Sequence, residues 1–192
     1  MSLKITDGVP IPVTAPQAAA TEMVAAAITS HQLEIQRARQ EKSDWCWAAC
    51  AHMVLTVFDQ NVSQCDVASF LRETNCCLEA NEGECNLACD AEDVLHIYDN
   101  FGVTGTLVDD TLSFSSIREE IRDRQQPVEV GIKWDEGGGH LIVVYGCSVD
   151  GTARFVRVHD PLFQMGEIRF SELRRYKQQG NWAVSWKGFA QI

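Results

Sequence analysis

The sequence predicts an α+β fold in which helices come first and an antiparallel β half follows. Two observations carry this prediction. Between residues 45 and 101, apolar side chains recur at helical spacing or form a run too long for a strand. After Gly102, short runs rich in Val, Ile and Phe are separated by glycine turns, as strands are. Helices grouped before strands are typical of α+β proteins.

The composition is that of a folded globular protein and excludes several classes. The 192 residues are 45% hydrophobic and 22% charged, which suits one domain with a sizeable core. The formal charge of −11 repels phosphate backbones and anionic lipid surfaces, so we expect neither nucleic acid nor a membrane as a partner. No apolar run approaches the ~20 residues that cross a bilayer.

The N-terminal region is expected to be separate from the main domain. Residues 1–35 contain three early prolines among small residues and predict an arm or linker. Thr21 to Arg39 shows an imperfect helical pattern, which predicts that the arm is partly helical. No signal peptide is visible at its start. Residues 36–192 are expected to form the main domain.

The first helix of the main domain is predicted to begin at a cysteine. Trp45 to Phe58 is an almost uninterrupted apolar run without Gly or Pro, and its length favours a buried helix. Ser43 and Asp44 are good N-cap residues, so the helix should begin at or beside Cys46.

The remaining elements follow from periodicity and turn signals. Further helices are predicted at Val62 to Arg72, with Ser63 as N-cap, and at Ala91 to Phe101, with Asn75 to Asp90 between them as an irregular loop. The second half is predicted to hold a helix at Ser115 to Arg124 and strands at Val128 to Trp134, Leu141 to Gly146, Ala153 to His159 and Trp182 to Trp186.

Three residues have the types and positions of a nucleophile, a base and its orienting acid. Cysteine nucleophiles react as thiolates, which a helix N-terminus and a neighbouring imidazolium both favour, and Cys46 is placed to have both. His140 follows three glycines and begins a strand, from which its ring can face a helix. Asp160 ends the next strand before Pro161 and can orient that ring. Each also has an ordinary interpretation: a buried apolar Cys, a structurally bonded His and a turn-forming Asp.

Gln40 is a candidate for the oxyanion hole. Hydrolysis of an amide needs donors for the developing oxyanion, often a side-chain amide together with the backbone N–H of the nucleophile. Gln40 precedes Cys46 by six residues. Because glutamine is neutral, it can donate without disturbing a thiolate–imidazolium pair. An ordinary surface role is the common alternative for a glutamine.

These residues carry a family resemblance. QEKSDWCWAA, from Gln40 to Ala49, resembles the nucleophile segment of papain-like cysteine peptidases, and GGGHLIVVYG followed by VHDP resembles the segments with the second and third catalytic residues. The whole pattern is most similar to a compact bacterial group with AvrRpt2-type effectors and C39-like peptidases. The resemblance covers Gln40 to about Phe163 and implies a papain-like fold, with a helical half carrying the nucleophile packed on an antiparallel β half.

Two features depart from papain itself. Cys46 and His140 are 94 residues apart, a shorter distance than in papain, which suggests trimmed loops. The third residue is Asp160 rather than Asn, and the Asn-Ser-Trp-Gly motif is absent.

The resemblance implies a cysteine endopeptidase that uses Cys46, His140 and Asp160, with Gln40 in the oxyanion hole. No metal or organic cofactor is expected. The expected partners are a protein or peptide substrate and a protein inhibitor or immunity partner, and we expect a monomer. Two alternatives stay open: an acyl-transfer enzyme of transglutaminase or deamidase type on the same triad, and a non-catalytic binding module.

A cluster of cysteines favours a protein that is secreted or delivered into a target cell. Five of the eight cysteines lie between Cys65 and Cys89, and disulfides are common in oxidising compartments and rare in the cytosol. We prefer disulfides, with Cys50 or Cys65 among the partners, that staple the loop beside the nucleophile helix. The alternative is a zinc site with Cys76, Cys77, Cys85 and Cys89 as ligands. It is disfavoured because adjacent cysteines cannot easily both bind one tetrahedral ion.

Overall fold

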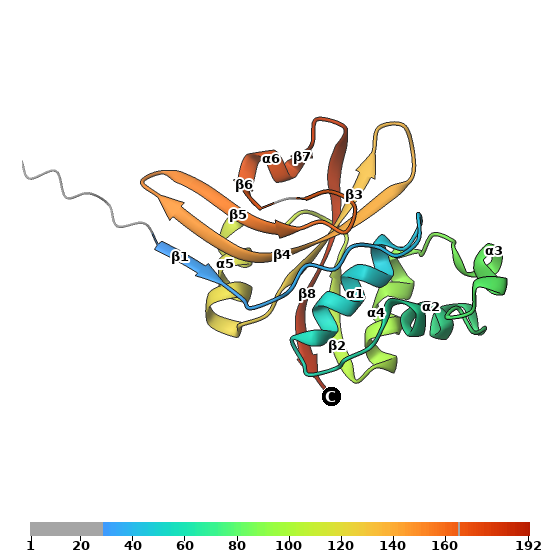
Figure 1. The fold of residues 1–192 in the computed structure, drawn as a ribbon. Coiled ribbons are helices and arrows are strands. Elements are labelled where there is room, and N and C mark those ends of the chain that lie inside the picture. Colours follow the sequence, from blue (N-terminus) through green and yellow to red (C-terminus); the bar gives the residue numbers. More distant parts are fainter. Residues whose placement is uncertain (1–28, 165) are drawn as a thin grey trace, which may run out of the picture.

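The computed structural model describes residues 29–164 and 166–192 (Figure 1). Its elements, in chain order, are β1 (Thr29–Gln32), α1 (Cys46–Thr56), α2 (Gln64–Arg72), η1 (Glu79–Asn81), α3 (Glu82–Cys85), α4 (Ala91–Asn100), β2 (Val103–Val108), α5 (Phe114–Arg118), η2 (Glu119–Arg124), β3 (Val128–Trp134), β4 (Gly139–Asp150), β5 (Ala153–His159), β6 (Glu167–Arg169), α6 (Phe170–Arg174), β7 (Arg175–Tyr176) and β8 (Gly180–Gln191).

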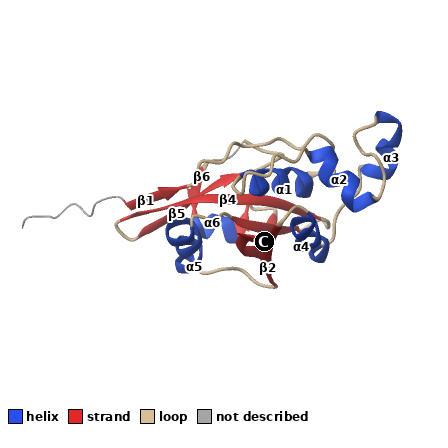
Figure 2. Cartoon of the chain, turned by 90° about the horizontal axis from the view of Figure 1, so that it is seen from below, coloured by secondary structure: helices blue, strands red, loops and turns tan. Residues whose placement is uncertain are grey.

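One antiparallel sheet forms the β half. Its strands follow the order β2-β8-β3-β4-β5-β6, while β1 pairs with β4 and β7 pairs with β8. The long strand β4 is shared: its first half pairs with β3 and its second half with β1, and β5 runs along its other edge. Figures 1 and 2 show α1 to α4 gathered at one end of this sheet, whereas β1, the β4–β5 hairpin and α5 lie at the other.

Helix α1 is the centre of the helical half. It packs against β4, α2 and α4, and nearly all of its side chains are buried, because its sequence is apolar on every side. Met53, Val54 and Leu55 are fully buried, and each side chain of this kind contributes ~1.5–3 kcal/mol to the stability of the fold. The first residue of α1 is therefore held on a helix whose side chains are mostly buried.

The predicted α+β class is confirmed, and α1 to α4 precede every strand of the described residues except β1. Two errors concern the N-terminal region and the cap of α1. The Thr21 to Arg39 helix is wrong beyond residue 28, because residues 29–32 form strand β1 and residues 33–39 are not helical; its first part lies outside the described residues. Ser43 and Asp44 do not cap α1: Trp45 occupies the N-cap position, and the Ser43 hydroxyl bonds to Asp44 instead.

Other elements differ in extent. Ser63 caps α2 as predicted, by accepting a hydrogen bond from the backbone N–H of Asp66. Strands β4 and β8 are longer than their predicted cores, since the sequence pattern marks only their apolar middles. Strand β2 was not predicted because Gly105 interrupts its run; no side chain fits easily there, since a Cβ would lie 3.0 Å from the Phe189 ring. Within the described residues, no helix has the length and hydropathy to cross a bilayer.

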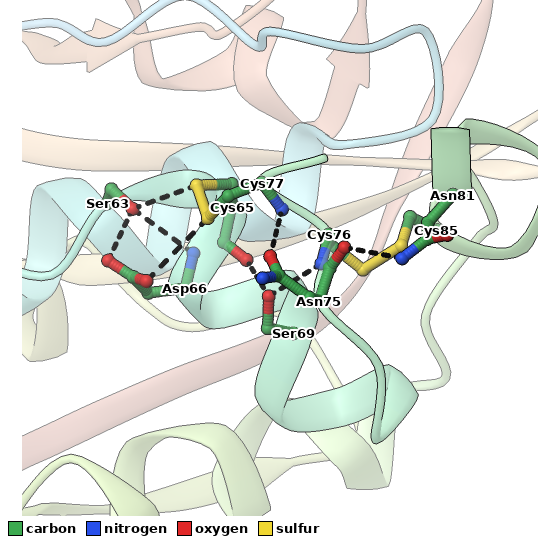
Figure 3. The surroundings of a disulfide bond; sticks show 9 residues. All are labelled: Ser63, Cys65, Asp66, Ser69, Asn75, Cys76, Cys77, Asn81 and Cys85. Carbon is green, nitrogen blue, oxygen red and sulfur yellow. Dashed lines mark hydrogen bonds between the residues drawn. A yellow bond between two sulfur atoms is a disulfide. The ribbon is translucent and has the colours of Figure 1, made fainter. Parts of the chain in front are cut away.

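The cysteine cluster forms two disulfides, as preferred from the sequence (Figure 3). Cys65 of α2 bonds Cys77, and Cys76 bonds Cys85 of α3. The zinc interpretation is therefore wrong for these sulfurs, while Cys50 and Cys89 are free thiols. The predicted loop between α2 and α4 contains the short helices η1 and α3.

The disulfide-bonded segment is attached to the start of α1. The indole N–H of Trp45 donates to the carbonyl of Cys85 at 2.8 Å, and that of Trp47 donates to the carbonyl of Leu87 at 3.1 Å. The loop therefore braces the two residues that flank Cys46.

Candidate active site

Cys46 is the first residue of α1 and is partly exposed. The first hydrogen bond of the helix runs from the N–H of Ala49 to the carbonyl of Trp45, so the N–H groups of Cys46, Trp47 and Ala48 have no acceptor within α1. The positive end of the helix dipole consequently lies beside the Cys46 side chain, where it stabilises negative charge.

His140 lies near the start of β4, between Asp160 and Cys46. Its Nε2 is 2.8 Å from Oδ1 of Asp160, and the Cys46 side chain, which lines the same cleft, is close enough to the ring to raise its pKa. Because Asp160 occupies Nε2, the other ring nitrogen, Nδ1, is the one available to the thiol. The structure thus brings the three predicted residues into one line of contacts.

The resting histidine carries a proton at neutral pH. Burial by itself lowers the pKa of His140, but the hydrogen bonds and charges of Asp160 and Cys46 outweigh burial and raise the pKa from 6.5 to about 9. An imidazolium next to a cysteine is the arrangement that favours a reactive thiolate.

Asp160 is fully buried and ionised. Burial opposes its charge, but the hydrogen bond and the charge of His140, together with the hydroxyl of Tyr176, hold the pKa of Asp160 below its usual value. Its Oδ1 also accepts from the backbone N–H groups of Leu162 at 2.7 Å and Phe163 at 2.9 Å. The carboxylate is therefore fixed by its own turn as well as by the histidine.

A strap of chain holds Gln40 next to that turn. His159 Nε2 bonds to the carbonyl of Ile35 at 2.7 Å, Arg37 Nε donates to the carbonyl of Asp160 at 2.6 Å, and the N–H of Gln40 donates to the carbonyl of Pro161 at 3.2 Å. These three hydrogen bonds attach residues 35–40 to residues 159–161.

The side-chain amide of Gln40 lines the same cleft as Cys46 but is engaged with the backbone. Its Nε2 donates to the carbonyls of Lys42 at 2.9 Å and Ser43 at 2.5 Å, while its Oε1 has no hydrogen-bond partner. Both hydrogens of the amide therefore point at backbone acceptors in this structure.

Cys46 and His140 open into a cleft of about 450 Å³ between the helical and β halves. The helical wall comes from the start of α1 and from residues 88–91 at the start of α4, and the opposite wall comes from Trp134, the glycines 137–139 and β8. Two exposed carboxylates, Asp44 and Asp90, are in the lining, and no Lys or Arg of the described chain is.

Trp134 covers the histidine on the cleft side. Its indole stacks on the His140 ring, with centroids 5.6 Å apart and the planes 21° from parallel. A Cβ at Gly180, opposite Trp134 in the sheet, would come within 2.6 Å of the indole, so glycine is needed there to seat it. The stacked indole covers one face of the His140 ring, which is 4% exposed.

Sequence reasoning missed Tyr176 and Arg37. Tyr176 donates its hydroxyl to Oδ2 of Asp160 at 2.6 Å, from the two-residue strand β7. A single tyrosine near a turn and an arginine in an expected arm have no motif around them, so no signal in the sequence could have assigned them to the site.

The comparisons with known proteins agree with this geometry. The sequence model of the family described as papain-like cysteine protease AvrRpt2 matches residues 29–179. A search of curated proteins found no match.

Two solved structures share the fold. A double glycine motif protease from an AMS/PCAT transporter, in complex with its leader peptide, is 17% identical, with a TM-score of 0.55 over 84% of this chain and 95% of that chain. The peptidase domain of Streptococcus ComA, a bifunctional ABC transporter in a quorum-sensing pathway, is 14% identical, with a TM-score of 0.56 over 82% of this chain and 99% of that one.

The family match spans most of the chain, including Cys46 and His140, and the fold is that of papain-like peptidase domains. The chain therefore belongs to the family of papain-like cysteine proteases described as AvrRpt2.

Proposed function

We propose that this cysteine peptidase is an endopeptidase whose nucleophile is Cys46, whose general acid and base is His140 and whose orienting acid is Asp160. The observation that carries the proposal is the line of contacts from the start of α1 through the His140 ring to a buried, ionised carboxylate.

The reaction proceeds in two halves. The Cys46 thiolate attacks the peptide carbonyl, the S–C bond forms, and the C–N bond breaks as the His140 imidazolium gives its proton to the leaving amine. A water then attacks the acyl-enzyme while His140 takes its proton, and the thiolate leaves. Asp160 keeps the ring in one tautomer and stabilises its charged form throughout.

The oxyanion is assigned to two donors, the backbone N–H of Cys46 and the side-chain amide of Gln40. The free N–H groups at the start of α1 and the position of Gln40 in the cleft lining support this assignment. Since both amide hydrogens of Gln40 bond to the carbonyls of Lys42 and Ser43, one of these bonds has to be released or shared when the oxyanion forms.

The substrate is proposed to be a protein or peptide. The cleft is open and bordered by aromatic and apolar side chains, and one of the structures that share the fold holds a leader peptide. The two disulfides support a role in a secreted or delivered protein, since such bonds persist in oxidising compartments. Action as a monomer and control by a protein inhibitor are parts of the same proposal.

The experiment is cleavage of a proteome-derived peptide library by the wild-type chain and by Cys46→Ala. We expect new peptide termini only with the wild type, because the variant keeps the fold but has no nucleophile. Deamidated or crosslinked products without new termini support the acyl-transfer alternative. Equal cleavage by both proteins refutes the role of Cys46.

A further inference from the structure

The two oxygens of the Asp160 carboxylate have different partners. Oδ1 is held by three donors: His140 Nε2 and the backbone N–H groups of Leu162 and Phe163. Oδ2 has one, the hydroxyl of Tyr176 at 2.6 Å. A buried carboxylate oxygen without a donor is costly, so this single hydroxyl is all that satisfies Oδ2.

The fold places Tyr176 away from the cleft. Its side chain is 1% exposed and is not part of the cleft lining. Strand β7 pairs with β8 through Tyr176 and Gly180, and the phenol ring lies 6.3 Å from the indole of Trp134, centroid to centroid. The hydroxyl therefore contacts Asp160 on the side away from the cleft, out of reach of a substrate in the cleft.

We propose that Tyr176 is a positioning residue of the active site, which acts through Asp160 by holding Oδ2 and keeping the carboxylate ionised and turned toward His140. This role rests on the proposed function of the triad, and it extends the line of contacts by one member, Cys46–His140–Asp160–Tyr176.

The pKa shifts of Tyr176 and Asp160 agree with a hydrogen bond that the Tyr176 hydroxyl donates and the Asp160 carboxylate accepts. Burial, and after it the hydrogen bond to Asp160, raise the pKa of Tyr176, so the hydroxyl keeps its proton and can only donate to the carboxylate. The same bond is among the causes that lower the pKa of Asp160. The loss of a hydrogen bond to a charged acceptor is expected to shift the titration of that acceptor by about one to two pH units.

The other groups near Asp160 do not replace this donor. The titratable groups that face Asp160 are His140 of β4, Tyr176 of β7 and the buried thiol of Cys50 of α1. The guanidinium of Arg37 bonds to the backbone carbonyl of Asp160 and not to its carboxylate. Removal of the Tyr176 hydroxyl therefore leaves Oδ2 without a partner.

The test is Tyr176→Phe, which keeps the ring and removes the hydroxyl. The readout is the rate at which iodoacetamide alkylates Cys46 between pH 3 and 9, with the site located by fragment mass spectrometry. Because this rate reports the thiolate–imidazolium pair directly, it needs no substrate. Thermal unfolding of each variant checks that the fold is kept.

The matched control is Tyr98→Phe. Tyr98 is another fully buried tyrosine, and its hydroxyl donates to the carboxyl of Glu129 at 2.8 Å, outside the triad. Its substitution removes a hydrogen bond between a buried phenol and a buried carboxyl without touching Asp160.

On acidification the alkylation rate of Cys46 falls, and this fall is the acid limb of the pH profile. In Tyr176→Phe we expect the acid limb to lie at a pH about one unit or more higher than in the wild type. In Tyr98→Phe we expect it to stay at the wild-type pH. The shift is toward higher pH because the Asp160 carboxylate, once it lacks the Tyr176 donor, takes up its proton at higher pH. A protonated Asp160 no longer stabilises the His140 imidazolium. On a cleaved peptide, kcat should fall more at pH 5 than at pH 8, with KM unchanged.

Two results overturn the proposal. One is an acid limb in Tyr176→Phe that coincides with that of the wild type; the other is an equal shift in Tyr98→Phe, which would mark a general effect of lost stability. A wild-type Cys46 that reacts at every pH like an isolated thiol contradicts the proposed triad itself, and the role of Tyr176 with it.

Discussion

Asp160 joins the parts of the catalytic network that come from different segments of the chain. Its side chain contacts His140 and Tyr176, and its backbone carbonyl accepts from Arg37 in the strap that carries Gln40. At the scale of single residues, burial lowers the pKa of His140, and this carboxylate, together with Cys46, outweighs burial and keeps His140 protonated at neutral pH.

This charge sets the alkaline limit of activity. The pKa of His140 is raised to about 9, so we predict that kcat/KM of the wild type falls as the pH rises through about 9, when the imidazolium loses its proton. In Asp160→Asn the raising charge is absent, and the alkaline limb should move down by about one pH unit or more.

The pH dependence of kcat/KM for one peptide measures both effects. Asp123→Asn is the control, because Asp123 is exposed and pairs with Arg122 far from the triad in sequence and contacts. An alkaline limb that stays at the same pH in Asp160→Asn would show that the carboxylate does not set the proton affinity of His140.

The residue types of the triad could be predicted from the sequence, and the reason is physical. A cysteine between two tryptophans at a helix start, a histidine after three glycines and an aspartate before a proline each have local constraints that the sequence records. Tyr176 and Trp134 owe their places to the pairing of β7, β8 and β3, which depends on contacts between distant residues.

At the scale of elements, the helical half is attached to the sheet by a buried pair of side chains. The hydroxyl of Tyr98 in α4 donates to Oε2 of Glu129 in β3, and Oε1 of Glu129 has no partner. Burial raises the pKa of Glu129 from 4.5 to about 8, and the bond from Tyr98 only partly opposes this. The thiols of Cys50 and Cys89 are the other titratable groups near it.

The Glu129 carboxyl should make stability depend on pH. Its pKa is higher in the folded chain than in the unfolded one, so its contribution is fully present below pH 4.5 and is lost as the pH rises toward 8. Glu129→Gln keeps an acceptor for Tyr98 and cannot ionise. We predict similar free energies of unfolding for variant and wild type at pH 5, and a variant that is more stable by a few kcal/mol, on the order of 1.4 per pH unit, at pH 8.5.

Urea unfolding at pH 5, 7 and 8.5 measures this difference. A gap between the two proteins that does not change with pH would contradict a buried, neutral Glu129.

The disulfide-bonded segment is the second element with a distinct role. Cys76–Cys85 fixes α3, whose last residue supplies the acceptor for Trp45, and the chain continues from there into the cleft wall at residues 88–91. We predict that Cys76→Ser/Cys85→Ser lowers the free energy of unfolding by about 2–4 kcal/mol and lowers kcat/KM, because the wall and the start of α1 lose their brace.

Thermal unfolding and peptide cleavage, without reductant, measure these losses. Wild-type protein alkylated without reductant should keep both disulfides and carry label on free thiols only. Labelling of Cys76 or Cys85 in the native protein would show that the bond is absent.

The helices, more than their connections, could be predicted from the sequence. Helix α1 is specified by its own apolar run, and α2 by its cap at Ser63. Strand β1 could not be predicted, because its Ala-rich surroundings have helical propensity and only pairing with β4 makes it extended.

At the scale of the whole molecule, the chain is acidic, with a formal charge of −11, and the cleft is acidic as well. Asp44 and Asp90 line it, and the described lining contains no basic side chain except His140. The field of such a cleft attracts cationic peptides and repels acidic ones.

We therefore predict that peptides with Lys next to the scissile bond have a higher kcat/KM than matched peptides with Glu, and that salt reduces the difference. Asp44→Asn/Asp90→Asn should reduce it as well, whereas Asp123→Asn should not. Competition between the two peptides at low and high ionic strength measures the preference. If the double variant prefers the Lys peptide as strongly as the wild type does, the two carboxylates are not the origin of the preference.

The most direct test of the account is labelling of the wild-type chain and of His140→Ala by an epoxide-type thiol inhibitor, followed by mass mapping of the labelled residue. The contacts of Cys46 with His140 predict one label per wild-type molecule, on Cys46, and slow or absent labelling in His140→Ala. A label on Cys89, the other free thiol of the cleft, or equal labelling of Cys46 in both proteins would contradict the activation of Cys46 by His140.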